Sequence, residues 1–162
     1  MNDHLAKRYL SDAALSFVDD SLLRCARRLY QCGFASISSA QMAAVADRIR
    51  RAATLEKAKE ETAAFLSHQM AKLKAKHDRQ GKATSWYEPA SGAGAGQALG
   101  DLLMDWIQNE RYLNGADKDV ISILDRLAAL QRFWARFHVF YRYGAKFNED
   151  LPPTEIEEAE KP

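Results

Sequence analysis

The residue types that carry out catalysis or bind metals occur in this sequence without the spacings that those tasks require. No His-x-x-x-His, Glu-x-x-His or Gly-x-Ser-x-Gly motif is present. His68 and His77 lie nine residues apart, with no carboxylate or thiol one turn further on to complete a metal site. Asp101 and Asp105 lie one helical turn apart, which a solvated helix face explains equally well. The sequence therefore predicts a protein that is not an enzyme and that needs no cofactor.

Lysine and arginine residues form the remaining pattern with chemical meaning, because the net charge of +1 hides strong segregation. Residues 24–82 carry 13 Lys/Arg against five Asp/Glu, and residues 126–147 carry five against none. Residues 83–125 carry two against seven, and residues 148–162 carry one against six. Such alternation is typical of a polyanion site combined with complementary self-contacts. The alternative is that the blocks simply intermingle in space.

The basic residues fall at spacings that suit contacts with a phosphate backbone. Lys72, Lys76 and Arg79 are spaced at four and three residues, so they project from one side of a helix. Side chains of this kind hold phosphates without reading base sequence. Trp86 and Tyr87 follow and offer stacking faces for unpaired bases, although such a pair more often covers a core. The candidate RNA-binding residues are Arg48, Arg51, Lys72, Lys76, Arg79, Lys82, Arg136 and Arg142.

Apolar residues recur at helical spacing along most of the chain, and no segment has the pattern of a strand. We expect an all-α, single-domain bundle of about five helices, with a flexible loop at 80–96 and a disordered acidic tail at 148–162. Gly33 should end the first helix, and Ser38 or Ser39 should cap the second. The expected helices cover 5–31 with a break near 11–12, 40–78 with a bend near Thr54, 97–112, and a long aromatic-rich final helix at 117–147.

Bulk composition narrows the class of protein further. The sequence is 47% hydrophobic and 28% charged, which argues against wholesale disorder. No apolar run approaches about 20 residues, and no signal sequence opens the chain, so we expect a cytoplasmic protein without a membrane span. Cys25 and Cys32 lie seven residues apart. We interpret them as reduced thiols that serve in packing rather than as a disulfide or a metal site.

Three stretches, taken in order, resemble the small helical subunit of type III CRISPR–Cas effector complexes. Residues 37–42 lead into the basic amphipathic helix of Arg48 and Arg51. Residues 70–79 are similar to the family's central Leu-Lys-x-Lys stretch, which ends in arginine. Residues 133–144 resemble its closing aromatic helix, although Arg142 stands where the family often has histidine and Tyr143 where it often has lysine. The resemblance covers about residues 15–147.

The resemblance implies a non-catalytic, RNA-binding structural subunit. Several copies would stack head to tail along a guide RNA–target RNA duplex, with copies of itself and the other effector subunits as partners. Alternating acidic and basic blocks suit such stacking, because head-to-tail contacts generate open filaments. Two alternatives stay open: a helical adaptor whose basic face meets an acidic protein, and a phage-type helical protein that binds DNA.

Overall fold

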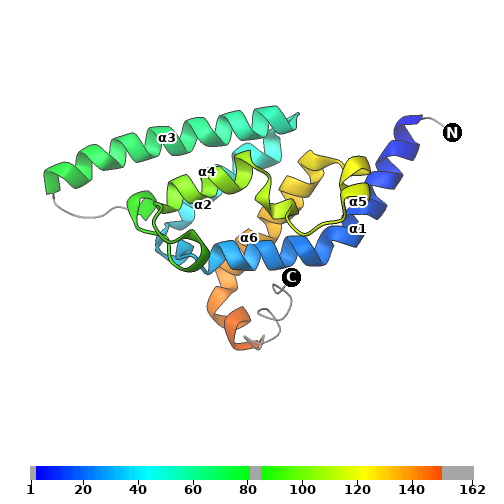
Figure 1. Cartoon of the computed structure of the whole chain (residues 1–162). Coiled ribbons are helices and arrows are strands. Elements are labelled where there is room, and N and C mark those ends of the chain that lie inside the picture. Colours follow the sequence, from blue (N-terminus) through cyan, green and yellow to red (C-terminus); the bar gives the residue numbers. More distant parts are fainter. Residues whose placement is uncertain (1–2, 81–84, 151–162) are drawn as a thin grey trace.

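The computed structural model describes residues 3–80 and 85–150, with side chains described for 11–72, 85–92 and 94–143. These residues form an all-α, single-domain bundle (Figure 1), as predicted. Across the described ranges no strand occurs, and only an isolated β-bridge joins Pro89 to Ala98. The α-helices are α1 Asp3–Tyr30, α2 Ser39–Arg51, α3 Leu55–Gln80, α4 Leu99–Gln108, α5 Lys118–Ile123 and α6 Arg126–Asp150. The 3-10 turns are η1 Phe34–Ser36, η2 Ser85–Tyr87, η3 Gly92–Gly94 and η4 Arg111–Leu113.

Three of the signals at the boundaries of the first three helices are those read from the sequence. Gly33 follows α1 with φ 112°, a left-handed conformation that glycine adopts at no steric cost. Ser38 caps α2, because its hydroxyl accepts a hydrogen bond from the backbone N–H of Gln41. Thr54 does the same for Lys57 at the start of α3, which confirms the predicted bend. These caps fix where the α2–α3 hairpin turns.

An aromatic cluster on α6 forms the centre of the core. The Phe133 ring stacks on Tyr112 of η4 at 5.1 Å between centroids and on Trp106 of α4 at 6.1 Å. Phe137 meets Phe34 of η1 edge to face at 5.3 Å. Such pairs add to the burial of their large apolar surfaces. Figure 1 shows α6 crossing α1. It also shows α3 on the side of α4 and α2 that lies away from α1.

The prediction of one long final helix from 117 to 147 is wrong in one respect, because two helices, α5 and α6, occupy this stretch. Leu124 adopts an extended backbone (ψ 136°) between α5 and α6. The Asp125 carboxylate then accepts a hydrogen bond from the backbone N–H of Ala128 and caps α6. The described residues therefore hold six α-helices rather than about five. Leu124 is nonetheless buried, so the apolar periodicity continues across the break and conceals it.

Three smaller boundaries also differ from the prediction. The first helix α1 runs without the break expected near 11–12. The helix expected at 97–112 ends at Gln108, and a 3-10 turn follows. The last helix reaches Asp150, three residues beyond the predicted domain limit at 147. Residues 151–162, most of the predicted acidic tail, lie outside the described residues, and the flexibility expected for 80–96 stays a prediction.

No helix among the described residues combines the length and apolar character needed to span a bilayer.

Candidate nucleic-acid interface

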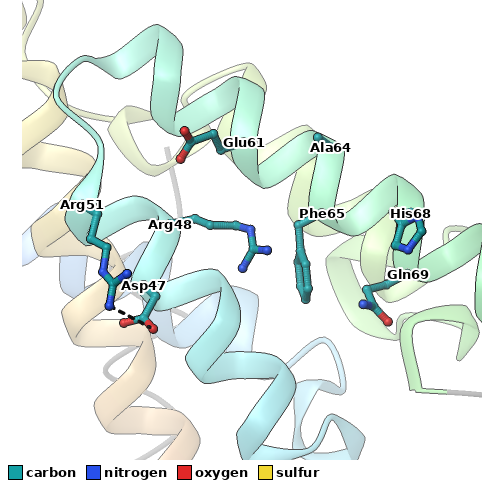
Figure 2. Close-up of a pocket in the computed structure, with 8 residues that line it drawn as sticks. All are labelled: Asp47, Arg48, Arg51, Glu61, Ala64, Phe65, His68 and Gln69. Carbon is teal, nitrogen blue, oxygen red and sulfur yellow. Dashed lines mark ion pairs between the residues drawn. The ribbon is translucent and has the colours of Figure 1, made fainter.

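An open groove of about 700 Å³ lies between α2 and α3 (Figure 2). The turn capped by Thr54 brings the two helices side by side. The C-terminal half of α2 forms one wall and the middle of α3 forms the other. The side chains that line it are Asp47, Arg48, Arg51, Glu61, Ala64, Phe65, His68 and Gln69.

Arg48 is the central side chain of this groove, and it is held in place from two directions. Its Nη1 donates a hydrogen bond of 2.8 Å to the carbonyl oxygen of Ala44, one turn earlier on α2. Its guanidinium lies over the Phe65 ring of α3, 4.2 Å from the centroid, in a cation–π contact. Figure 2 shows the Arg48 side chain extending from α2 toward Phe65. The cation is therefore pre-positioned in the groove, and no carboxylate among the described residues forms an ion pair with it.

Acidic side chains offset part of the groove's positive charge. Asp47 accepts from Arg50 at 2.6 Å and lies 4.0 Å from Arg51. Both arginine side chains are about three-quarters exposed, so these pairs are weak. Glu61 lines the opposite wall. Arg48, Arg50 and Arg51 share the last turn of α2, but Arg50 and Arg51 share the Asp47 carboxylate, and the charges that line the groove nearly cancel.

The α3 wall of the groove continues toward the basic end of the helix. Lys72 is exposed and follows His68 by four residues and Phe65 by seven, so the helical period places it on the groove side. Lys76 and Arg79 lie four and seven residues further along α3, but their side chains lie outside the described residues, and Lys82 does so entirely. Arg48, Arg51 and Lys72 are therefore the candidate residues that the fold brings toward one surface.

Arg136 occupies a different part of the molecule. Its Nη2 and the Nε of Arg132 both donate to the Asp19 carboxylate on α1, the latter at 2.8 Å. These hydrogen bonds, from Arg136 first and Arg132 second, lower the pKa of Asp19 to about 2. Because its charge is compensated within the fold, Arg136 is a poor candidate for a phosphate contact.

Arg142 is exposed near the other end of α2. The preceding residue, Tyr141, donates its hydroxyl hydrogen bond to the carbonyl oxygen of Ile37, just before α2 begins. The Arg142 guanidinium lies 5.6 Å from the centroid of the Tyr143 ring. Arg48 and Arg51 lie in the last turn of α2, so the length of that helix separates them from Arg142.

Trp86 is not available for stacking on a base. The side chain is fully buried, and its Nε1 donates a 3.0 Å hydrogen bond to Gln41 on α2. Tyr87 is only half-buried. The more ordinary interpretation of this pair, a cover over the core, is correct for Trp86. The aromatic ring that lines the groove is Phe65.

The sequence did not identify three of the groove residues, Phe65, His68 and Gln69, as site residues, because they form a groove only together with the opposite helix. A signal did exist, since Phe65, His68 and Lys72 recur at three and four residues on a helix that begins beside three arginines. Within the described residues, no group of three His, Cys, Asp or Glu side chains is placed to hold a metal ion. Comparisons with protein-family models, curated proteins and solved structures found no match.

Proposed function

We propose that this chain is a non-catalytic RNA-binding subunit, and that copies of it stack along a guide RNA–target RNA duplex in a type III CRISPR effector complex. The observation that carries RNA binding is the α2–α3 groove, where Arg48 and Arg51 face the side of α3 that continues into Lys72. The order of three sequence stretches supports the narrower assignment to that complex.

The contacts in this groove suit a sugar–phosphate strand. Arg51 and Lys72 are exposed, as side chains that neutralise phosphates are, although Arg51 also lies 4.0 Å from the Asp47 carboxylate. Arg48 lies over Phe65, so the other flat face of its guanidinium is available to stack on a base, and the N–H groups at its edge that Ala44 does not occupy are available to a phosphate. His68 and Gln69 add hydrogen-bonding groups beside it. Asp47 and Glu61 oppose strand binding, so affinity must come largely from the basic end of α3.

Replacing the three spaced cations of α3 tests this proposal. The variant Lys72→Gln/Lys76→Gln/Arg79→Gln should bind single-stranded RNA more weakly. It forms fewer phosphate contacts, so its binding releases fewer counterions from the RNA. The slope of log K against log salt should become shallower by about 0.7 per contact, or about 2 in total. Fluorescence anisotropy across a salt series measures it. The matched control is Arg24→Gln/Lys57→Gln/Lys118→Gln, which removes equal charge elsewhere. An unchanged slope in the α3 variant rules out this surface.

A protein-binding adaptor is the second candidate function, and one feature favours it. Phe17 on α1 is 80% exposed and Ile123 on α5 is 51% exposed, and exposed aromatic residues often anchor protein partners. The two functions differ in a native pull-down treated with RNase. An RNA-binding subunit should lose its partners, whereas an adaptor should keep them. Competition between single-stranded RNA and duplex DNA tests the DNA-binding alternative.

A further inference from the structure

The charges that line the α2–α3 groove balance one another, which limits the kind of group that its centre can hold. Arg48 and Arg51 are opposed by Asp47 and Glu61, so the groove lacks the excess of cations that a phosphate site requires. Lys72 lies beyond the lining residues, toward the basic end of α3. The centre of the groove therefore suits a neutral group, with the phosphates of the same strand placed to one side of it.

Arg48 and Phe65 give this centre a flat stacking surface. The Arg48 guanidinium lies 4.2 Å from the centroid of the Phe65 ring and is held by its 2.8 Å hydrogen bond to the carbonyl oxygen of Ala44. Both side chains are half-buried, so they are ordered by the fold and still reachable from the groove. Unpaired bases stack on guanidinium planes and on aromatic rings. A neutral, planar part of an RNA strand is its base.

Hydrogen-bonding side chains lie on both sides of this surface along α3. Glu61, Phe65 and Gln69 recur every four residues, so they share one face of the helix. Glu61 and Gln69 each lie about 6 Å from Phe65 along the helix axis, in opposite directions. Figure 2 shows the three side chains on α3, with Arg48 reaching from α2 toward the middle one. A base stacked at Arg48 has a polar side chain toward each of its ends.

Glu61 supplies the carboxylate that remains available in the groove. Asp47 accepts a hydrogen bond from Arg50 at 2.6 Å and lies 4.0 Å from Arg51. The Glu61 side chain is exposed and forms no hydrogen bond or ion pair with another residue that the structure describes. A carboxylate can only accept hydrogen bonds, so it favours a base edge with two neighbouring donors. Among the four RNA bases, guanine has that edge, formed by its N1–H and its 2-amino group.

We propose that the α2–α3 groove binds an unpaired guanine of the RNA, stacked on Arg48, with Glu61 accepting hydrogen bonds from N1–H and the 2-amino group. Gln69 donates to N7 or O6 on the opposite edge, where guanine carries acceptors. This assignment rests on the proposed RNA binding and narrows it from any sugar–phosphate strand to one with a guanine outside base pairs. Glu61 is then the residue that sets specificity.

Binding of the full chain to oligonucleotides that differ at one base tests the proposal. The probes are dye-labelled oligouridines of about ten nucleotides with guanosine or inosine at the centre, followed by fluorescence anisotropy. The guanosine strand should bind about tenfold more tightly, because inosine lacks only the 2-amino group and loses one charge-assisted hydrogen bond. In duplexes with a complementary strand, where cytidine occupies the same edge, the two should bind equally.

Two variants of α3 separate specificity from charge. Glu61→Gln should make the guanosine and inosine strands bind equally, because an amide offers one acceptor oxygen and no charge. The matched control is Glu60→Gln, which removes the same charge from the preceding residue, outside the groove lining, and should keep the tenfold ratio. Either variant reduces repulsion of phosphates, so the ratio of the two affinities, and not the affinity itself, is the readout.

The outcomes distinguish this site from the proposed function. Equal binding of the two strands by the unaltered chain, or a tenfold ratio that survives in Glu61→Gln, overturns the guanine site and leaves RNA binding standing. A chain that binds neither strand contradicts the proposed function instead. The guanine site is then decided by an NMR titration of the Arg48 Nε–H resonance with guanosine and inosine monophosphates. A larger shift with the guanosine nucleotide supports the site, and equal shifts or none overturn it.

Discussion

Asp19 and Arg27 lie on the same row of α1 and show two opposite situations for a charged side chain. Asp19 accepts hydrogen bonds from Arg132 and Arg136, which stabilise its ionised form and tie α1 to α6. Arg27 is more deeply buried and has no such partner among the described residues. The first charge is compensated within the fold, whereas the Nε and Nη1 of the second have no hydrogen-bond partner among the described residues.

Asp19 should give the fold a measurable dependence on pH. Its pKa is about 2 in the folded chain, below the ordinary 3.8, so its stabilisation is present above about pH 4 and is lost as pH falls toward 2. Asp19→Asn should therefore lower the free energy of unfolding by about 1–2 kcal/mol at pH 7, allowing for partial exposure of the arginines. Urea denaturation at pH 7 and at pH 2–3 measures the difference.

The control for this experiment is Asp20→Asn, which changes an exposed carboxylate on the same turn of α1. That variant should keep the free energy of unfolding within about 0.5 kcal/mol at both pH values. An Asp19→Asn variant that lost as much stability near pH 2 as at pH 7 would show that shape, rather than charge, matters at this position.

At the scale of elements, the break between α5 and α6 determines how the aromatic helix enters the core. Leu124 is buried in an extended conformation, and Asp125 begins a new helix one residue later. The core contacts of Phe133 and Phe137 depend on the direction that α6 takes from that point. A capping carboxylate at a surface position thereby helps to define the interior.

Asp125→Ala should lower the free energy of unfolding by about 1 kcal/mol, because the first turn of α6 loses the acceptor for the N–H of Ala128. Asp125→Asn should retain most of the stability, since an amide oxygen also caps. Ser39→Ala, beside the α2 cap but not forming it, is the matched control. Chemical denaturation measures all three, and an equal effect of Asp125→Ala and Ser39→Ala would contradict the capping role.

The all-α class and several helix boundaries could be predicted, because they depend on local periodicity and on side chains next to their own backbone. Ser38, Thr54 and Gly33 are examples. The α5–α6 break could not be read from periodicity, since Leu124 keeps its place in the apolar pattern. The groove needed the structure as well, because Arg48 and Phe65 meet only once α2 folds back against α3.

At the scale of the whole molecule, several acids of the 83–125 block are already paired within the chain. Glu110 binds both Lys59 of α3 and Arg126 of α6, and Asp105 binds Arg111. Asp105 pairs within its own block, but Glu110 joins its block to both neighbouring basic blocks, as the simpler interpretation of the charge segregation expects. The proposed stacking of copies must therefore use other acidic residues or apolar surface.

The proposed stacking predicts a definite dependence of assembly size on RNA length. Native mass spectrometry of the chain with guide–target duplexes of increasing length should show complexes that grow by whole copies, because head-to-tail contacts do not close. RNase treatment should return them to smaller species. A scrambled single strand of equal length is the control, and complexes of one fixed stoichiometry at every duplex length would contradict the stacking model.

The burial of Trp86, Trp106 and Trp134 has a practical consequence for spectroscopy. All three tryptophans of the chain are less than 10% exposed, so their emission should lie at short wavelength and resist quenching by iodide. A ligand bound in the α2–α3 groove would meet Phe65 and no indole. Intrinsic fluorescence should thus report unfolding strongly and groove occupancy hardly at all, and a titration with RNA will need a dye attached to one partner.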